Sequence, residues 1–357
     1  EKHSAALAAW PASAGGGQQG VLAVTAACVD MLQVPMNSVV GAEGGVEGLV
    51  APAGFQDTLL RQGACSSLVA VLENSGVLDS PGAALLPVNV LSRLVLSSTE
   101  SAKQFVAAGG LNSSLVQRLL ADTNPSAMLV DVLLVISQLA RLPARDSFNP
   151  YESISKAAIY PNIKNALERQ GLVGPLIDRC SDADKSTRKF ACFAIGNAGF
   201  HNATLYEALR PAIGPLVGLL RSSEEDKTRA NAAGALGNLV RNSAALCGEL
   251  IRAGALHALL DTAQSQDEGA QGQSMGSTAG SNAAAPGDGG SPVSIALFSL
   301  GNMCAHRECR EALLAANINM TIKRLSANPN PTVQKYLQRI QTKLQTASTA
   351  AAPPQAR

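Results

Sequence analysis

The sequence has few aromatic residues, little charge and no long apolar segment. Aromatic residues make up 3% of its 357 residues and charged residues 15%, whereas hydrophobic residues make up 46%. One globular core usually contains more large rings, whereas small residues such as alanine let helices stack closely. No apolar run approaches the roughly 18 residues that a membrane span needs. We therefore expect closely packed helices and no association with a membrane.

The sequence also lacks a charge imbalance and a catalytic motif. Its 28 basic and 27 acidic residues give a net charge of +1, which argues against a nucleic-acid partner. It contains no phosphate-binding glycine loop followed by lysine, no kinase signature, no nucleophile elbow and no His-Glu-x-x-His motif. We therefore expect a chain that is not an enzyme and that needs no cofactor.

One short stretch resembles a set of metal ligands. Cys304, His306 and Cys309 lie within six residues, but no fourth ligand follows nearby. The seven cysteines are scattered, and most lie on apolar helix faces, as reduced core residues of an intracellular protein do. The alternative to a metal site is a pair of core cysteines beside a turn histidine, and we expect no metal.

A five-residue phrase that ends in Gly-Asn occurs three times, at Phe193–Asn197, Gly234–Asn238 and Phe298–Asn302. Gly196 and Gly237 are 41 residues apart, whereas Gly237 and Gly301 are 64 apart, with a low-complexity insertion at 264–290 between them. Without this insertion the two intervals agree. A period of about 40 to 47 residues is typical of armadillo and HEAT arrays, in which each repeat buries its apolar face against its neighbours.

A second landmark, a turn residue before an apolar helix, has the same period. The turn residues Gly171, Ala212, Gly254 and Asn317 precede expected helices at Leu172–Cys180, Ile213–Leu220, Ala255–Leu260 and Ile318–Leu325. Expected helix starts follow at the capping boxes Ser181/Asp184 and Ser223/Asp226 and at Asn124-Pro125, Ser291-Pro292 and Asn330-Pro331. The pattern predicts an all-α, armadillo/HEAT-like, right-handed superhelical solenoid of about six to seven repeats, each with three helices.

Composition and phase divide the chain into four parts. We expect a disordered or poorly ordered lead at 1–20 and degenerate armadillo-like repeats at 21–150. Regular repeats follow at 151–345, interrupted by the insertion at 264–290, and a mobile tail follows at 346–357.

The repeated asparagine is the candidate binding residue. Asparagine is a mediocre helix former, so its return at one phase needs a reason. Stacked repeats place equivalent positions in a row, and an amide can clamp the backbone of an extended peptide. The predicted partner-binding groove consists of Asn197, Asn238, Asn302, Phe193, Phe298, Asn231, Phe190, Lys227 and Arg241. In the structural alternative each asparagine bonds the backbone of a neighbouring repeat and each phenylalanine is core.

The run from Arg188 to Ser243 resembles the C-terminal armadillo region of Fused-type serine/threonine kinases, chiefly of the plant and algal branch, without their kinase domain. The resemblance implies a non-catalytic scaffold that binds a kinesin-related or other microtubule-associated protein. It implies a cytoplasmic location on the cytoskeleton, in the axoneme of a cilium or flagellum or on a microtubule array that acts in cytokinesis.

Two alternatives remain open. The chain could be a regulatory domain that docks on its own kinase domain, or an importin-like peptide adaptor. The repeats of importin-α carry tryptophan four residues before the groove asparagine, where this sequence has phenylalanine or glycine. This difference disfavours the adaptor, because tryptophan rings hold lysine side chains by cation–π attraction.

Overall fold

The structure is a computed structural model that describes residues 29, 58–73, 75–79, 81–141, 167, 171–200, 203–265 and 290–350. The chain divides into two compact units, Glu1–Leu176 and Ile177–Arg357. Each unit is considered by itself. The residues described are helical or lie in turns, and they include no β-strand. Among their helices, none combines the length and the apolar character that crossing a membrane requires.

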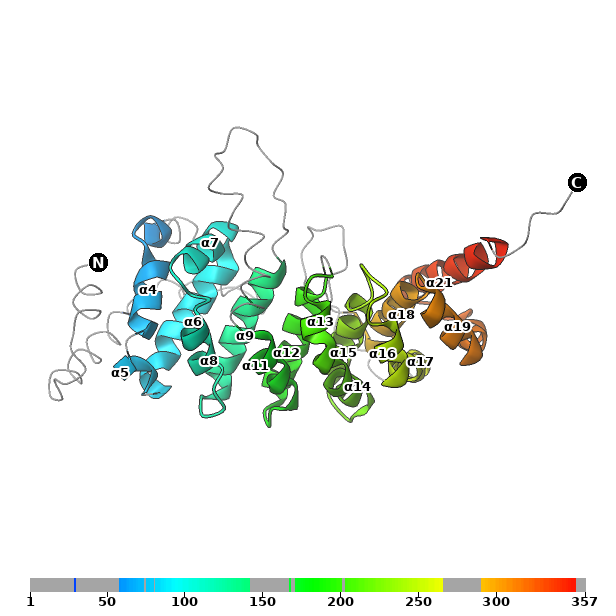
Figure 1. The fold of residues 1–357 in the computed structure, drawn as a ribbon, viewed down its shortest axis with the longest axis horizontal. Helices are drawn as coiled ribbons and strands as arrows, with labels where there is room; N and C mark the ends of the chain where they lie inside the picture. The colour runs from blue at the N-terminus through cyan, green and yellow to red at the C-terminus, as the bar shows by residue number, and fades with distance from the viewer. Residues whose placement is uncertain are drawn as a thin grey trace, which may run out of the picture. The chain divides into compact units, whose positions relative to one another are not determined.

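The described part of the first unit consists of helices. Its described helices are α4 (Ala64–Glu73), α5 (Ser75–Leu78), α6 (Pro81–Ser97), α7 (Thr99–Ala107), α8 (Ser113–Leu119) and α9 (Ser126–Arg141). The long helix α6 is central, because α4, α5, α7 and α9 all pack against it (Figure 1). Short helix α11 (Val173–Asp178) spans the boundary between the units.

The second unit repeats a pattern of two short helices and one longer helix. Its elements are η2 (Arg179–Ser181), α12 (Lys185–Ala198), α13 (Tyr206–Leu209), η3 (Arg210–Ala212), α14 (Ile213–Arg221), α15 (Asp226–Asn238), α16 (Cys247–Arg252), α17 (Ala255–Gln264), α18 (Pro292–Met303), α19 (Arg307–Ala315), α20 (Ile318–Leu325) and α21 (Pro331–Ala350). We call α12, α15, α18 and α21 the third helices, because each ends one repeat.

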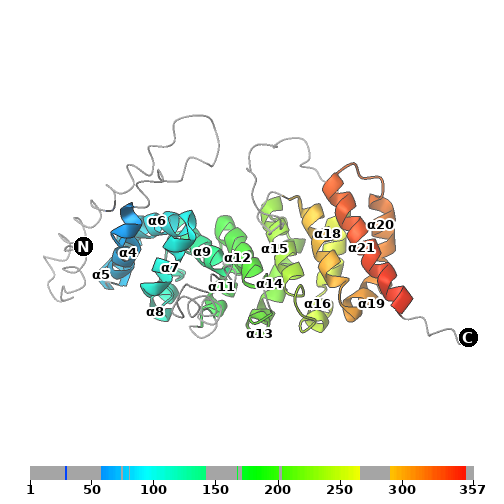
Figure 2. The same cartoon turned by 90° about the horizontal axis from the view of Figure 1, so that it is seen from above.

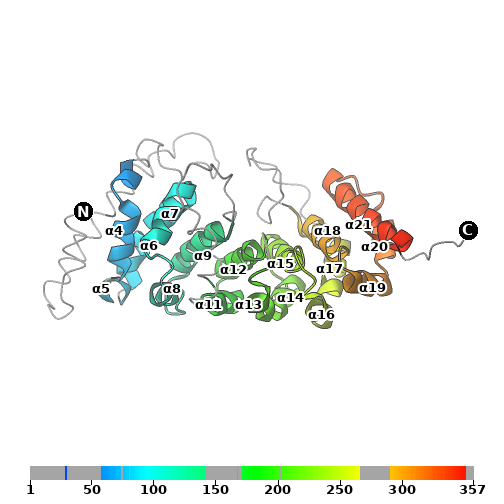
Figure 3. The same ribbon diagram turned by 45° about the horizontal axis from the view of Figure 1, so that its top comes forward.

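Equivalent helices of successive repeats pack against one another. The third helices form one row, in which α12 packs on α15, α15 on α18 and α18 on α21 (Figure 2). The second helices form another row, from α14 through α17 to α20, which lies beneath α15 and α18 (Figure 3). Small side chains make this stacking possible, since Ala232, Ala233 and Ala235 of α15 are fully buried. The predicted three-helix armadillo arrangement is confirmed.

The turns before the second helices have the expected backbone geometry. Gly63, Gly171 and Gly254 adopt left-handed φ angles of 70°, 63° and 72°, and Asn317 adopts 59°. Glycine and asparagine tolerate this region better than other residues, so their recurrence marks the turn. Before α8 the left-handed residue is Gly109, at 86°. Ala212 has a right-handed φ of −69°, because the 3₁₀ segment η3 leads directly into α14.

The predicted helix starts are partly correct. Ser291 and Asn330 accept hydrogen bonds from the first turns of α18 and α21, as expected. The cap of α12 is Asp184, whose carboxylate accepts from the Thr187 N–H at 2.7 Å, so the expected start at Ser181 is wrong by three residues. Ser181 instead ends η2, because the chain turns once more before α12. Helix α15 begins after Glu225 without a side-chain cap.

One more predicted helix start and one predicted domain boundary differ from the structure. Asn124 does not cap α9; its amide donates to the Arg118 and Leu119 carbonyls of the preceding helix. Helix α21 continues through Ala350, so the tail expected from 346 overlaps its last turns. The expected lead at 1–20 and most of the insertion at 264–290 lie outside the described residues, although α17 extends to Gln264.

Candidate functional site

A series of side chains in the second unit bonds the glycine carbonyls of the preceding third helices. The Asn238 amide donates to the Gly196 carbonyl at 2.9 Å, and the Asn302 amide donates to the Gly237 carbonyl at 3.2 Å. In the last repeat the Lys343 ammonium takes the same role and donates to the Gly301 carbonyl at 2.7 Å. We call these three bonds the carbonyl ladder.

The Gly-Asn phrase supplies both halves of each bond. Its glycine lies in the last turn of a third helix, where carbonyls have no partner within the helix. The asparagine of the next repeat satisfies that carbonyl and so joins two successive third helices. Because the phrase recurs at one phase, the same bond can form at each junction.

The glycine also permits the close approach that the bond requires. A Cβ atom at Gly237 would lie 2.7 Å from the Cα atom of Ser299 in α18 and even closer to its side chain. The Ser299 hydroxyl bonds back to the Ala233 carbonyl at 2.8 Å. The crossing of α15 and α18 at Gly237 therefore leaves no room for a side chain. At Gly196 the nearest atom, the Cα of Ala235, would be 3.4 Å away, so that contact is looser.

Further polar groups join the repeats beside the ladder. The Tyr206 hydroxyl donates to the Asn238 carbonyl at 2.5 Å and accepts from the Asn242 N–H at 3.1 Å. Burial raises the pKa of Tyr206, so its hydroxyl stays protonated and keeps donating. Seven residues before Asn238, the Asn231 amide donates to the Lys189 carbonyl at 3.1 Å.

The predicted groove asparagines are therefore buried side chains. Asn197, Asn238 and Asn302 are 1%, 0% and 3% exposed, and Asn231 is 5% exposed. The bonds of Asn238, Asn302 and Asn231 to a neighbouring repeat are those of the structural alternative. Contact of these amides with a partner stays a prediction, and it would require them to leave or share their present bonds.

Aromatic residues of the predicted groove are more accessible than the amides. Phe190 and Phe193 are half-buried on α12, whereas Phe298 is 8% exposed and packs edge-on against Tyr336, with ring centroids 5.6 Å apart. The Arg241 guanidinium is exposed and lies 4.0 Å from the centroid of the Phe200 ring. Phe190, Phe193 and Arg241 are therefore accessible to solvent, whereas the amides and Phe298 are buried.

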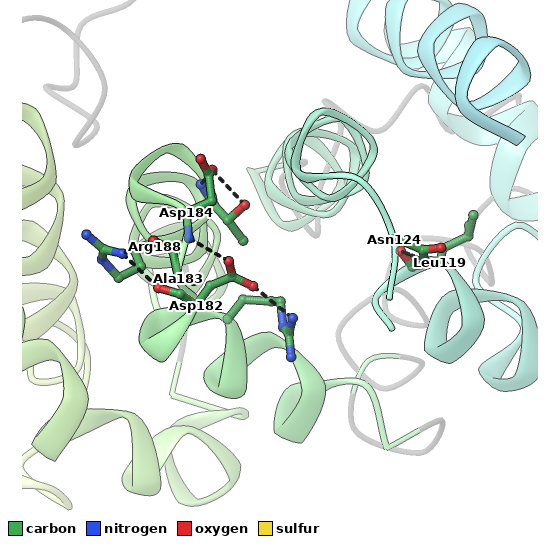
Figure 4. A network of polar contacts seen from close by, with 8 residues as sticks. Leu119, Asn124, Asp182, Ala183, Asp184 and Arg188 are labelled. Carbon is green, nitrogen blue, oxygen red and sulfur yellow. Dashed lines mark hydrogen bonds and ion pairs between the residues drawn. The ribbon is translucent and has the colours of Figure 1, made fainter. Parts of the chain in front are cut away.

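Basic residues near the starts of α12 and α15 are held by acidic neighbours. Arg188 pairs with Glu224, and its guanidinium also donates to the Asp182 and Ala183 carbonyls at 2.7 and 2.9 Å (Figure 4). Lys189 pairs with Glu225 at 3.0 Å. Because carboxylates already neutralise both basic residues, these ion pairs disfavour a phosphate site. The predicted groove residue Lys227 is exposed in the first turn of α15.

The cysteines behave as core residues. Cys304 and Cys309 are fully buried, and burial raises the pKa of Cys304 to about 11. The His306 ring contacts the Val240 carbonyl. No cluster of three potential metal ligands occurs among the residues that the structure describes.

Sequence reasoning missed three residues of the site, namely Lys343, Arg339 and Tyr206. Lys343 follows Asn302 by 41 residues, the same interval that separates Asn197 from Asn238, so spacing alone could have found it. Arg339 donates to the Asn302 side-chain oxygen at 2.7 Å. No comparable sequence signal identifies Arg339 or Tyr206, because their partners come from other repeats.

These features define the class of the protein: it is an all-α armadillo-repeat solenoid. The armadillo/beta-catenin-like repeat family matches residues 209–241, which include the second Gly-Asn phrase. A designed armadillo repeat protein in complex with the peptide (KR)4 has a TM-score of 0.61 at 19% identity, over 78% of this chain and 99% of that one. A computationally designed armadillo repeat protein for modular peptide recognition has a TM-score of 0.59 at 20% identity over the same shares.

Two curated relatives identify the chain more narrowly. Serine/threonine-protein kinase TIO of Arabidopsis thaliana is 31% identical over an alignment of 293 residues, which covers 70% of this chain and 20% of the relative. Serine/threonine-protein kinase 36 of Mus musculus is 29% identical over an alignment of 190 residues, which covers 43% of this chain and 14% of the relative. The chain is an armadillo-repeat region homologous to part of these Fused-type kinases, and it spans a fifth or less of their length.

Proposed function

We propose that the chain is a non-catalytic scaffold that binds a segment of another protein along the row of third helices. The observation that carries this proposal is the in-phase row itself. It packs α12, which carries the half-buried rings of Phe190 and Phe193, against α15, and the exposed cation of Arg241 follows the end of α15. Repeated, aligned positions suit an extended or helical segment better than a small molecule. The designed armadillo neighbour in complex with a peptide supports this mode of binding.

The homology to Fused-type kinases supports a partner class. We propose a kinesin-related or other microtubule-associated protein, in the cytoplasm on an axoneme or on a microtubule array of dividing cells. The second candidate is the kinase domain of the same polypeptide, because both curated relatives are kinases. An importin-like role has less support, since no tryptophan precedes the asparagines of the repeated phrase.

Photo-crosslinking tests this proposal. A photoreactive amino acid replaces Phe193 on the third helix α12, and a control replaces the exposed His257 on the second helix α17. In native cells we expect crosslinks from position 193 to a kinesin-related or other microtubule-associated protein, and few from position 257. Crosslinks to a kinase domain alone would favour the second candidate. Equal, unselective crosslinking from both positions would contradict a binding face on the third helices.

A further inference from the structure

Positive charge is concentrated at the C-terminal end of the second unit. After Glu311 the sequence contains no acidic residue, but it contains the six basic residues Lys323, Arg324, Lys335, Arg339, Lys343 and Arg357. The chain as a whole has a net charge of only +1. A field of one sign in an otherwise balanced chain attracts groups of the opposite charge.

Three cations gather where α15, α18 and α21 meet. Arg339 donates to the Asn302 amide oxygen at 2.7 Å, and its guanidinium lies 5.3 Å from the centroid of the Phe298 ring. Lys343 lies one turn later on α21 and donates to the Gly301 carbonyl. Arg241, which follows α15, lies over Phe200 and interacts electrostatically with Arg339. We call Arg241, Arg339 and Lys343 the cation cluster.

The cation cluster has no acidic counterpart. Within the described part of the chain, no carboxylate lies at ion-pair distance from any of its three members. Some other basic residues of the unit do pair with carboxylates, including Arg188 with Glu224 and Arg210 with Glu249. Arg241 is exposed, and Arg339 and Lys343 are half-buried, so an incoming group can reach all three.

The partners that hold these cations do not neutralise them. Carbonyl oxygens, an amide and aromatic rings fix the positions of the cations but leave their full charge. Burial first, and the charge of Arg339 second, lower the pKa of both Arg241 and Lys343. An arriving anion would relieve this mutual repulsion and would meet side chains that are already positioned.

We propose that the cation cluster binds carboxylates of an acidic, Asp- and Glu-rich segment of the partner protein. This inference rests on the proposed function and specifies the chemistry of the segment that lies along the third helices. The half-buried ring of Phe200 provides an apolar contact beside Arg241. A basic peptide such as the (KR)4 bound by the designed armadillo neighbour would be repelled here.

The test is the binding of labelled octaglutamate and octalysine peptides to the whole 357-residue chain, followed by fluorescence anisotropy. One variant, Arg241→Gln, removes a guanidinium that forms no hydrogen bond among the described residues. A second combines Arg241→Gln, Arg339→Gln and Lys343→Gln, in which glutamine still offers a donor. The matched control is Lys323→Gln, which removes the charge of an exposed side chain on α20. Circular dichroism melting establishes that each variant folds.

We expect the wild-type chain to bind octaglutamate and not octalysine, with affinity that falls as salt rises. Arg241→Gln is expected to weaken binding about threefold and the triple variant about thirtyfold, at about 0.7 kcal/mol per charge. Lys323→Gln is expected to change it little.

Three results would overturn the inference: preference for octalysine, no binding of octaglutamate, or equal loss in Lys323→Gln and Arg241→Gln. If octaglutamate does not bind while position 193 still crosslinks to a microtubule-associated protein, the proposed function is retained. The proposal of an acidic partner segment is then rejected. Unselective crosslinking, in contrast, would remove the proposed function itself.

Discussion

Replacing Asn238 by alanine tests the carbonyl ladder directly. Asn238 is fully buried, and its amide donates to the Gly196 carbonyl at 2.9 Å. Alanine removes the donor and leaves this last-turn carbonyl without a partner in a site that water does not reach. Leaving a buried acceptor unsatisfied costs about 1–3 kcal/mol.

The net cost falls toward the lower half of that range. The Asn238 side-chain oxygen is itself buried and accepts no hydrogen bond among the described residues, so its removal relieves a standing penalty. Alanine is also the better helix former by about 0.5 kcal/mol. We therefore expect Asn238→Ala to destabilise the second unit by about 1–2 kcal/mol, which corresponds to a fall in melting temperature of about 2–4 °C per kcal/mol for a unit of this size.

The assay is thermal and urea unfolding, with Asn319→Ala as the matched control. Asn319 is exposed on α20, so the same chemical change there is expected to leave stability unchanged or slightly raised. If Asn238→Ala melts with the wild type, the bond to Gly196 contributes nothing, and the amide is free for another role. Unchanged melting of Asn238→Ala is the result that the groove predicted from the sequence would give.

Three further perturbations test the packing around the ladder. Gly237→Ala is expected to cost about 1–3 kcal/mol by overpacking against Ser299. In the control Gly218→Ala the new Cβ meets no atom within 4 Å, and stability is expected to rise by about 0.5–1 kcal/mol; equal melting of the two variants would contradict the close approach. Tyr206→Phe removes the hydroxyl that links two repeats and is expected to cost about 1 kcal/mol in urea unfolding, so an unchanged midpoint would exclude that link. Burial raises the pKa of Cys304 to about 11, so we expect alkylation of its thiol at pH 9 to be slow. We also expect the stabilisation that the buried neutral thiol contributes to be lost as pH rises from about 9 to 11. Rapid alkylation without unfolding would contradict the burial of Cys304.

The repeat could be predicted from the sequence because its markers are local. A left-handed residue before the second helices α11, α17 and α20 favours glycine or asparagine, so spacing identified Gly171, Gly254 and Asn317. Ala212, which precedes α14, is right-handed and is the exception. A proline after a cap residue was an equally reliable marker at Ser291 and Asn330. Such signals depend on the backbone of a few neighbouring residues, and the sequence contains them in full.

The role of the repeated asparagine could not be predicted, because it depends on a neighbouring repeat. The phase of Asn238 places it on the same face as its equivalents, but phase does not say whether that side chain points to solvent or to the carbonyl of Gly196. The packing of α12 against α15 settles this choice, because it brings the Gly196 carbonyl to 2.9 Å from the Asn238 amide. In the last repeat, Lys343 replaces the amide by a different chemical group that serves the same carbonyl position.

A crystal structure of the chain at high resolution would test the central claim most directly. The claim is that side chains of each third helix donate hydrogen bonds to glycine carbonyls of the preceding third helix. A partner would then contact the accessible rings and cations rather than these side chains. We predict that the Asn238 and Asn302 amide nitrogens lie within hydrogen-bond distance of the Gly196 and Gly237 oxygens, and Lys343 within reach of Gly301. Amides that point into solvent, with those three carbonyls bound to water, would contradict the claim.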